Sequence, residues 1–267
     1  MKIKLKKNYN LIIGLILFGI VFVIALVGIF YTPYNPNDLG TGLKNSGISL
    51  RHIFGCDNLG RDIFSRVQKG IGNTFFIAIA TVTIGTVVGV ISGALTGYYG
   101  GVFDEIIMRV NDALFSFPSV LLALVIISLL GPNKMNVILA LGIAFIPSFA
   151  RMVRAEFVKQ KNMDYVLSAR LMGASDFRIM FVHILPNTFG VLIPSIIIGF
   201  NNAVLAEAGL SYLGIGVQPP NASLGRMLSE AQAYLFTNPC YAIFPGIMII
   251  ILVLGLALVA EGLNEEN

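Results

Sequence analysis

Long apolar stretches separated by short polar segments dominate this chain. A helix rises about 1.5 Å per residue, so about 20 mostly apolar residues are needed to cross about 30 Å of hydrocarbon. On this measure the pattern predicts six transmembrane helices, at residues 11–30, 75–96, 113–130, 136–150, 188–206 and 241–260. The fourth stretch is short, and we expect it either to extend past Arg151 or to tilt little. The expected fold class is an all-α integral membrane protein.

Composition supports the same interpretation. The 267 residues are 56% hydrophobic and 12% charged, with a mean hydropathy of +0.82. An ordinary soluble domain is about 25% charged. So few charged residues cannot cover a water-facing surface, and we expect the lipid bilayer to surround the chain. The net charge of +4 is then no argument for nucleic acid binding, and no nucleic acid partner is expected.

The first apolar stretch follows four lysines within seven residues. A cleaved signal peptide is the alternative interpretation. The apolar run is long for a signal-peptide hydrophobic region of 7–15 residues, and no A-x-A cleavage site follows it. We therefore expect an uncleaved first helix.

The basic residues predict the orientation. With the N-terminus inside, the inner segments hold 11 Lys and Arg: four in the tail, Arg109, and six between residues 151 and 178. The outer segments hold seven. Positive residues favour the cytoplasmic side, so the chain is expected in the plasma membrane as a multi-pass protein with both termini cytoplasmic.

The second stretch carries Gly85, Gly89, Gly93 and Gly97 on one helix face. Glycines spaced by four permit close approach of another helix in a membrane. We expect this face to pack within the chain, and a face against a partner subunit is the alternative.

The polar segment between the fourth and fifth spans predicts a short amphipathic helix at residues 164–173. Asp164 favours the helix start, and Gly173 suits its end or a close contact. A second apolar stretch, 177–185, is expected to stop at Pro186. The small residues Ser168 and Ala169 suit docking into a protein groove better than anchoring in lipid.

This segment, DYVLSARLMGASDFRIMFVHILPN, resembles the cytoplasmic coupling loop of ABC importer permeases. The match is specific at Ala169, Gly173 and the Leu-Pro pair ending in Pro186. It departs at Leu167 and Ser168, where the family usually has Glu and Ala. Three more stretches are similar to the peptide and nickel permease group: HIFGCDNLGRDIFSR, GYYGGVFDEIIMRVNDALFSFPSVLLAL and AEAGLSYLGIGVQPPNASLG.

The resemblance implies a type I ABC importer permease, with residues 1–73 as tail, first span and outer loop. Residues 74–260 would form the permease core with its coupling loop at 151–187, and 261–267 a tail. The implied partners are a second homologous permease, two cytoplasmic ATPase subunits and an extracytoplasmic binding protein. No G-x-x-x-x-G-K-[ST] phosphate loop occurs in the sequence, so we expect ATP and Mg on the ATPases and no cofactor on this chain.

The implied cargo is short peptides, with nickel, free or chelated, as the alternative. The residues expected to couple to the ATPases lie in the coupling loop. They are Asp164, Tyr165, Ser168, Ala169, Gly173, Ala174, Phe177 and Pro186.

Two carboxylates near span ends are candidates for translocation or gating, because a charge at membrane depth is costly. Glu207 lies near the outer end of the fifth span and Asp112 near the inner end of the third. For both, a structural role satisfied by neighbouring groups is the alternative.

No metal site or enzymatic centre is expected. His52, Cys56 and Asp57 lie close in sequence, but a His and a Cys four residues apart form a weak metal motif. Asp57, Arg61 and Asp62 are expected to fold the outer loop through turns and ion pairs, with contact to a binding protein as the alternative. Cys56 and Cys240 are expected to be unpaired, although a disulfide is conceivable.

Three other functions compete with ATP-driven import. A secondary transporter would carry intramembrane charges for ion coupling, and the spans are nearly free of them. A membrane enzyme would need clustered catalytic groups, which the sequence does not show. A channel or scaffold is allowed by hydropathy, but the coupling loop argues against it.

Overall fold

The computed structural model describes residues 8–266, except for the side chains of 265 and 266; the lysine-rich tail 1–7 and Asn267 lie outside the described residues. The described chain is helical throughout its regular parts and contains no strand. Five helices are long and apolar enough to cross a membrane, and a sixth crossing is possible if one bent helix pair counts as a span. The all-α membrane fold is therefore confirmed.

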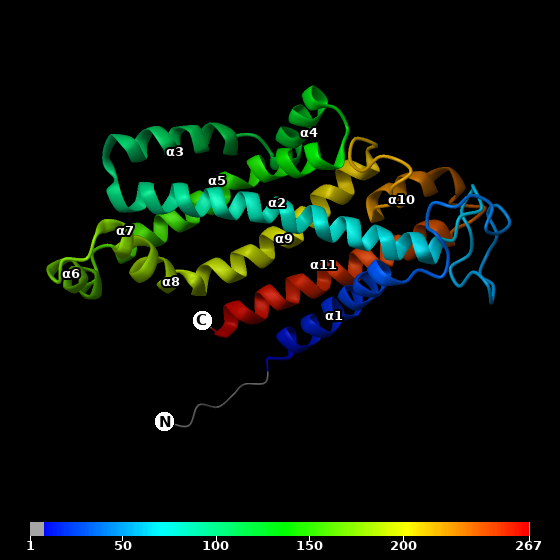
Figure 1. Cartoon of the computed structure of the whole chain (residues 1–267), viewed down its shortest axis with the longest axis horizontal. Helices are drawn as coiled ribbons and strands as arrows, with labels where there is room; N and C mark the ends of the chain where they lie inside the picture. Colours follow the sequence, from blue (N-terminus) through cyan, green and yellow to red (C-terminus); the bar gives the residue numbers. More distant parts are fainter. Residues whose placement is uncertain (1–7, 267) are drawn as a thin grey trace.

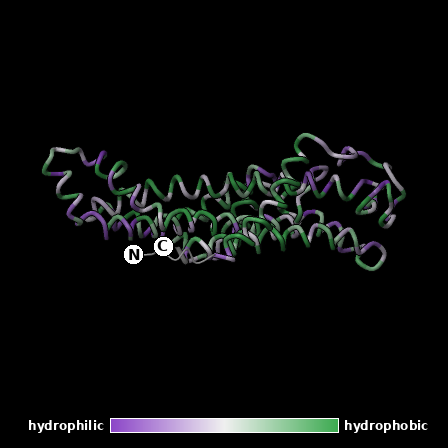
Figure 2. The backbone as a smooth tube through the Cα atoms, turned by 90° about the horizontal axis from the view of Figure 1, so that it is seen from below, coloured by the Kyte–Doolittle hydropathy of each residue, from purple (hydrophilic) through white to green (hydrophobic). Residues whose placement is uncertain are grey.

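The five long helices lie side by side as one elongated bundle (Figure 1). Figure 2 shows hydrophobic residues along the middle of the bundle and hydrophilic residues gathered toward its ends. Helix α2 has 37 residues and is about 55 Å long, which exceeds the hydrocarbon thickness. Hydropathy marks only the lipid-embedded part of such a helix. The five helices are α1 (Tyr9–Phe30), α2 (Ile63–Tyr99), α5 (Lys134–Gln160), α9 (Phe189–Tyr212) and α11 (Cys240–Glu266).

The predicted third span, 113–130, is wrong as a single helix. The chain forms α3 (Gly101–Phe115) and α4 (Ser119–Leu130), which meet at an angle of 86°. Pro118 lies between them, and proline disfavours helical backbone at the residue before it. Helix α4 alone is about 18 Å long, too short to cross the hydrocarbon. The fourth span extends past Arg151 to Gln160, which is the first of the two alternatives expected for it.

The four glycines of α2 pack against α5 within the chain, as expected. A Cβ atom on Gly89 would lie 2.5 Å from the Cβ of Phe149, and one on Gly93 would lie 2.5 Å from the Ala150 carbonyl oxygen. No side chain fits at such distances. Because the two backbones touch here, α2 and α5 form one rigid pair.

Helix α1 packs antiparallel to α11. The Asn8 side chain, which caps α1, donates a hydrogen bond of 2.6 Å to the carbonyl of Gly262. The first and the last described residues of the chain thus lie at one end of the bundle, on the side of α6 (Figure 1). We call this the α6 end. The opposite end, which carries the 31–62 segment, is the loop end.

The loop end contains α10 (Leu224–Ala231), a short 3-10 turn (Gln232–Tyr234) and a buried network of ion pairs. Arg61 contacts Asp57 at 2.6 Å and Glu230 at 3.0 Å, and Arg66 contacts Glu230 at 3.0 Å. Burial would raise the pKa of Glu230, but Arg66, the Tyr241 hydroxyl and Arg61 together hold it below its usual value. The network joins the 31–62 segment to α2, α10 and α11.

At the α6 end, the chain between α5 and α9 forms a compact helical connection. It consists of α6 (Asp164–Leu171), α7 (Asp176–Arg178), a π-helical turn (Ile179–Ile184) and α8 (Leu185–Asn187). The predicted helix at 164–173 is confirmed in its first eight residues. The predicted stop at Pro186 is wrong. This proline lies in the first turn of α8, where a helix does not need its missing N–H.

Candidate functional site

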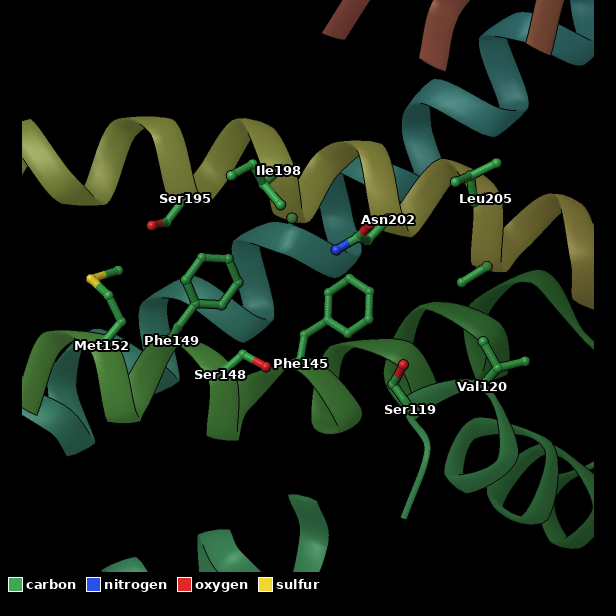
Figure 3. A pocket seen from close by; sticks show the side chains of 12 residues that line it. Ser119, Val120, Phe145, Ser148, Phe149, Met152, Ser195, Ile198, Asn202 and Leu205 are labelled. Atoms are coloured by element: carbon green, nitrogen blue, oxygen red, sulfur yellow. The ribbon is translucent and has the colours of Figure 1, made fainter. Parts of the chain in front are cut away.

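A cavity of about 510 Å³ lies between α4, α5 and α9 near the middle of the bundle (Figure 3). In the described part of the chain its lining carries no charged side chain. Hydroxyl and amide groups supply its polar atoms, and aromatic rings much of its apolar wall. The lining consists of Ser119, Val120, Phe145, Ser148, Phe149, Met152, Ser195, Ile198, Gly199, Asn202, Leu205 and Ala206.

The polar groups enter the cavity from three separate helices. Ser119 begins α4 after the bend, Ser148 follows Pro147 in α5, and Asn202 lies in the middle of α9. Figure 3 shows the rings of Phe145 and Phe149 pointing from α5 toward α9. Such a wall can offer hydrogen bonds and apolar contact to a polar, uncharged backbone, but it offers no counter-charge to a free ion.

Close approach of α5 and α9 depends on Gly199. A Cβ atom at this position would lie 2.8 Å from the tip of the Phe149 ring. The ring therefore closes part of the space between the helices. Phe149 also packs on Gly89 of α2, so the ring is positioned by the α2–α5 pair.

Sequence reasoning missed this cavity. The signals available were isolated polar residues inside apolar spans, namely Ser148, Ser195 and Asn202, the first two of them directly after a proline inside a helix. Polar residues within a membrane helix usually face a partner or a pathway. Ser195 and Asn202 both belong to α9, but helix geometry could not show that Ser148 of α5 shares their space, because it comes from a different helix.

Glu207 is completely buried near the loop end of α9. Its carboxylate accepts hydrogen bonds of 2.8 Å from the Thr74 hydroxyl in α2 and 2.6 Å from the Ser211 hydroxyl. The same Ser211 oxygen accepts the backbone N–H of Val217 at 3.0 Å. Glu207 does not line the central cavity, although its neighbours Leu205 and Ala206 do.

Asp112 is exposed in the last turn of α3, next to the bend that leads to α4. Its carboxylate forms an ion pair of 2.6 Å with Arg151, whose guanidinium lies 4.1 Å from the centre of the Phe115 ring. Nearby, Arg154 holds Asp104 through two hydrogen bonds of 2.6 Å. Asp112 thus joins α3 to α5.

The coupling-loop residues divide into two groups. Val166 and Ala169 are buried against the π-helical turn, so Ala169 faces the core of this chain. Apolar side chains on the other face are exposed: Leu171 is 88%, Met172 82% and Phe177 69% exposed. We call these three residues the α6 surface. Asp164, Tyr165 and Ser168 are also exposed, and Ala174 is partly buried. The Tyr165 hydroxyl donates a hydrogen bond of 2.6 Å to Gln160 at the end of α5.

Gly173 ends α6 as predicted. Its φ of +81° lies in the region that favours glycine, and a Cβ atom there would meet nothing within 4 Å. The glycine is therefore needed for the turn and not for a close contact inside this chain.

The loop-end residues His52, Cys56 and Asp57 have structural partners. His52 Nδ1 lies 2.9 Å from the Asp62 carboxylate, and Asp57 pairs with Arg61, so the expected ion pair between Asp57 and Arg61 is confirmed. Burial raises the pKa of the Cys56 thiol, and Cys56 and Cys240 are both free. Among the described residues, no group of three or more His, Cys, Asp or Glu could hold a metal ion.

Known proteins resemble this chain over most of its length. The dipeptide transport system permease protein DppC of Haemophilus influenzae is 37% identical over 97% of this chain and 90% of its own length. The glutathione transport system permease protein GsiD of Pectobacterium atrosepticum is 39% identical over 91% of this chain and 83% of its own length. A putative peptide transport system permease protein of Brucella abortus is 39% identical over 98% of this chain.

The fold matches a solved structure of the MetNI methionine ABC transporter in an inward-facing conformation. The TM-score is 0.61, with 18% sequence identity over 75% of this chain and 95% of that chain. At this identity the likeness concerns the fold alone. Residues 85–265 match the family described as binding-protein-dependent transport system inner membrane component. This match covers more than half of the chain and most of the helical bundle. The chain is a multi-pass membrane protein that belongs to the binding-protein-dependent transport system inner membrane component family.

Proposed function

We propose that this chain carries short peptides across the cytoplasmic membrane as one permease subunit of an ATP-driven importer. The observation that carries the proposal is the uncharged cavity between α4, α5 and α9 in a chain with peptide-permease relatives. A short peptide needs hydrogen-bond partners for its amides and apolar contact for its side chains, and the cavity offers both. The relatives named for dipeptide and glutathione transport support the same substrate class.

The partners follow from the same proposal. A second homologous permease completes the pathway, two cytoplasmic ATPases bind ATP and Mg, and an extracytoplasmic protein delivers cargo. This chain then binds no cofactor and catalyses no reaction. The α6 surface supports ATPase docking, because its exposed apolar residues lie at the end of α6 and on α7, outside the bundle.

The orientation is part of the proposal. With both termini and the α6 end in the cytoplasm, Arg151, Arg154, Lys159, Lys161, Arg170 and Arg178 lie on the cytoplasmic side. Closure of the ATPases on ATP would displace α6 and α7, and the helices would alternate between two openings of the cavity. The coupling loop from Asp164 to Pro186 would transmit this movement.

We assign gating roles to the two carboxylates. Glu207 would close the loop end, because its bonds join α2, α9 and, through Ser211, the segment that begins at Leu213. Asp112 would hold α3 against α5 through Arg151 while the α6 end is in one conformation. Neither carboxylate would contact cargo.

Uptake in a strain lacking the chain, with and without its restoration, tests the cargo. Labelled dipeptides and oligopeptides are measured beside radioactive nickel. Restoration of peptide uptake alone is expected. Restoration of nickel uptake alone would overturn the peptide assignment in favour of the alternative cargo. If neither uptake changes, the peptide assignment fails, while the membership of the chain in the permease family stands.

A further inference from the structure

The hydroxyl of Tyr98 is a meeting point of three helices at the α6 end. Tyr98 is the last residue but one of α2. Its Oη donates a hydrogen bond of 2.5 Å to the Asp176 carboxylate, at the start of α7. The Arg170 guanidinium, in the last turn of α6, donates to the same Oη at 3.1 Å. One phenolic oxygen therefore connects α2, α6 and α7.

The surroundings give this contact a fixed geometry. The Tyr98 ring is buried in the same apolar core as Val166, Ala169 and Ile179. A bond to a charged group is worth about twice a bond between neutral groups, and Tyr98 has one on each side. Displacing α6 and α7 without moving α2 would break both bonds and leave the hydroxyl of the buried Tyr98 without these two partners.

Movement of α2 reaches the rest of the bundle through α5. Gly97 lies next to Tyr98, and a Cβ atom on it would be 2.7 Å from the Cβ of Phe157. With the contacts of Gly89 and Gly93, this leaves no room for α2 to slide on α5. The chain already joins α5 to α6 directly, so Tyr98 adds the missing connection from the coupling segment to the second helix of the rigid pair.

We propose that Tyr98 is a positioning residue that transmits displacement of α6 and α7 to the α2–α5 pair. The inference rests on the proposed ATP-coupled import, and it concerns a residue outside the coupling loop itself. Loss of the hydroxyl leaves docking of the ATPases intact but uncouples their closure from the helices that line the cavity.

The test compares Tyr98→Phe with Tyr99→Phe in the complete importer with its ATPases and binding protein. Tyr99 is the matched control, because it neighbours Tyr98 but is 55% exposed. Tyr98→Phe is expected to lower peptide uptake about fivefold or more per ATP hydrolysed, with ATP hydrolysis and complex yield within twofold. Asp176→Asn is expected to act in the same direction, and the double variant to be no worse than the stronger single one.

A second measurement does not depend on cargo. Spin labels are placed on α2 and α9 through Gly72→Cys, where a side chain meets open space, and Tyr212→Cys, in a Cys240→Ser background. In the importer held with ATP and vanadate, the distance between labels is expected to shift with the native tyrosine and in Tyr99→Phe, and to shift less in Tyr98→Phe.

The outcomes separate the inference from the proposed function. Three results would overturn the role of Tyr98. The label distance could shift as much in Tyr98→Phe as with the native tyrosine, or it could fail to shift with the native tyrosine. Alternatively, Tyr98→Phe could lower peptide uptake and ATP hydrolysis in the same proportion. Absence of peptide uptake with the native tyrosine would overturn the proposed cargo, while the distance measurement would still judge the inference.

Discussion

At the loop end, Arg66 and Asp57 are completely buried and form ion pairs with Glu230 and Arg61, whereas at the α6 end Leu171 and Met172 are almost completely exposed. The first region is closed on itself by ion pairs that cross between distant segments. The second is joined to the bundle by apolar packing of Val166, Ala169 and Ile179 and by a few hydrogen bonds, such as those of Tyr98 and Tyr165. The difference indicates that the 31–62 segment, α10 and the adjoining ends of α2 and α11 form a fixed frame. It also supports the proposal that the α6 end meets the ATPases and moves.

The largest expected effect comes from breaking the frame. Arg66→Ala removes one of the two buried arginines that face Asp57 and Glu230 and leaves Arg61 alone against both carboxylates. Removing one member of a buried ion pair costs about 3–5 kcal/mol. Thermal unfolding of the detergent-solubilised protein measures this loss. Arg109→Ala is the control, because its pair with Glu105 is exposed and is worth at most about 1 kcal/mol. Equal losses in both variants would contradict the fixed frame.

A smaller effect is expected from glutamate substitutions at the α6 surface. They should weaken binding of the ATPases and leave the stability of the fold nearly unchanged. Leu171→Glu and Met172→Glu place a charge on a side chain that contacts little of this chain, so the unfolding temperature should stay within about 2 °C. Binding of the ATPases should weaken about tenfold or more, because an apolar anchor in an interface is worth about 1–2 kcal/mol. Copurification with the ATPases measures it.

The control for that experiment is Leu43→Glu, which changes an equally exposed leucine at the loop end. It is expected to leave ATPase binding unchanged. If Leu43→Glu weakens the association as much as Leu171→Glu does, the α6 surface is not the docking site.

The smallest expected effect is a pH dependence of the loop end. Because the pKa of Glu230 is lowered in the folded protein, its stabilisation is fully present above the ordinary carboxyl pKa and is lost as pH falls through the folded value. The unfolding temperature should therefore be flat from pH 7 to about pH 5 and fall by a few degrees below that. Glu230→Gln should flatten this acid limb, and an unchanged limb would show that other carboxylates control it.

The sequence predicted the spans best where apolar length alone decides them. Residues 11–30 were placed within two residues of the start of α1, because that helix is apolar over its full length. The prediction failed at 113–130, where composition is continuous but Pro118 turns the backbone by 86°. Apolar composition measures burial in lipid and carries no information about helix direction.

The sequence predicted that the coupling loop contains a short helix, but not which face of that helix is exposed. Its helix and its terminal glycine follow from local preferences, which residues a few positions apart determine. Which face is exposed depends on the π-helical turn that packs on Val166 and Ala169, and that turn comes from residues ten or more positions further along the chain. The central cavity was missed for the same reason.

The sequence by itself determined that this chain lies in a membrane, that it belongs with ABC importer permeases and that a short helix lies between the fourth and fifth spans. These properties depend on composition, apolar length and local motifs, all of which are written along the chain. Only the tertiary structure decided which polar groups share the cavity, that Glu207 faces away from it, and that Tyr98 joins α2 to α6 and α7. Each of these depends on side chains from helices that are distant in sequence, and their meeting is fixed by packing, above all where the glycines of α2 let α5 approach.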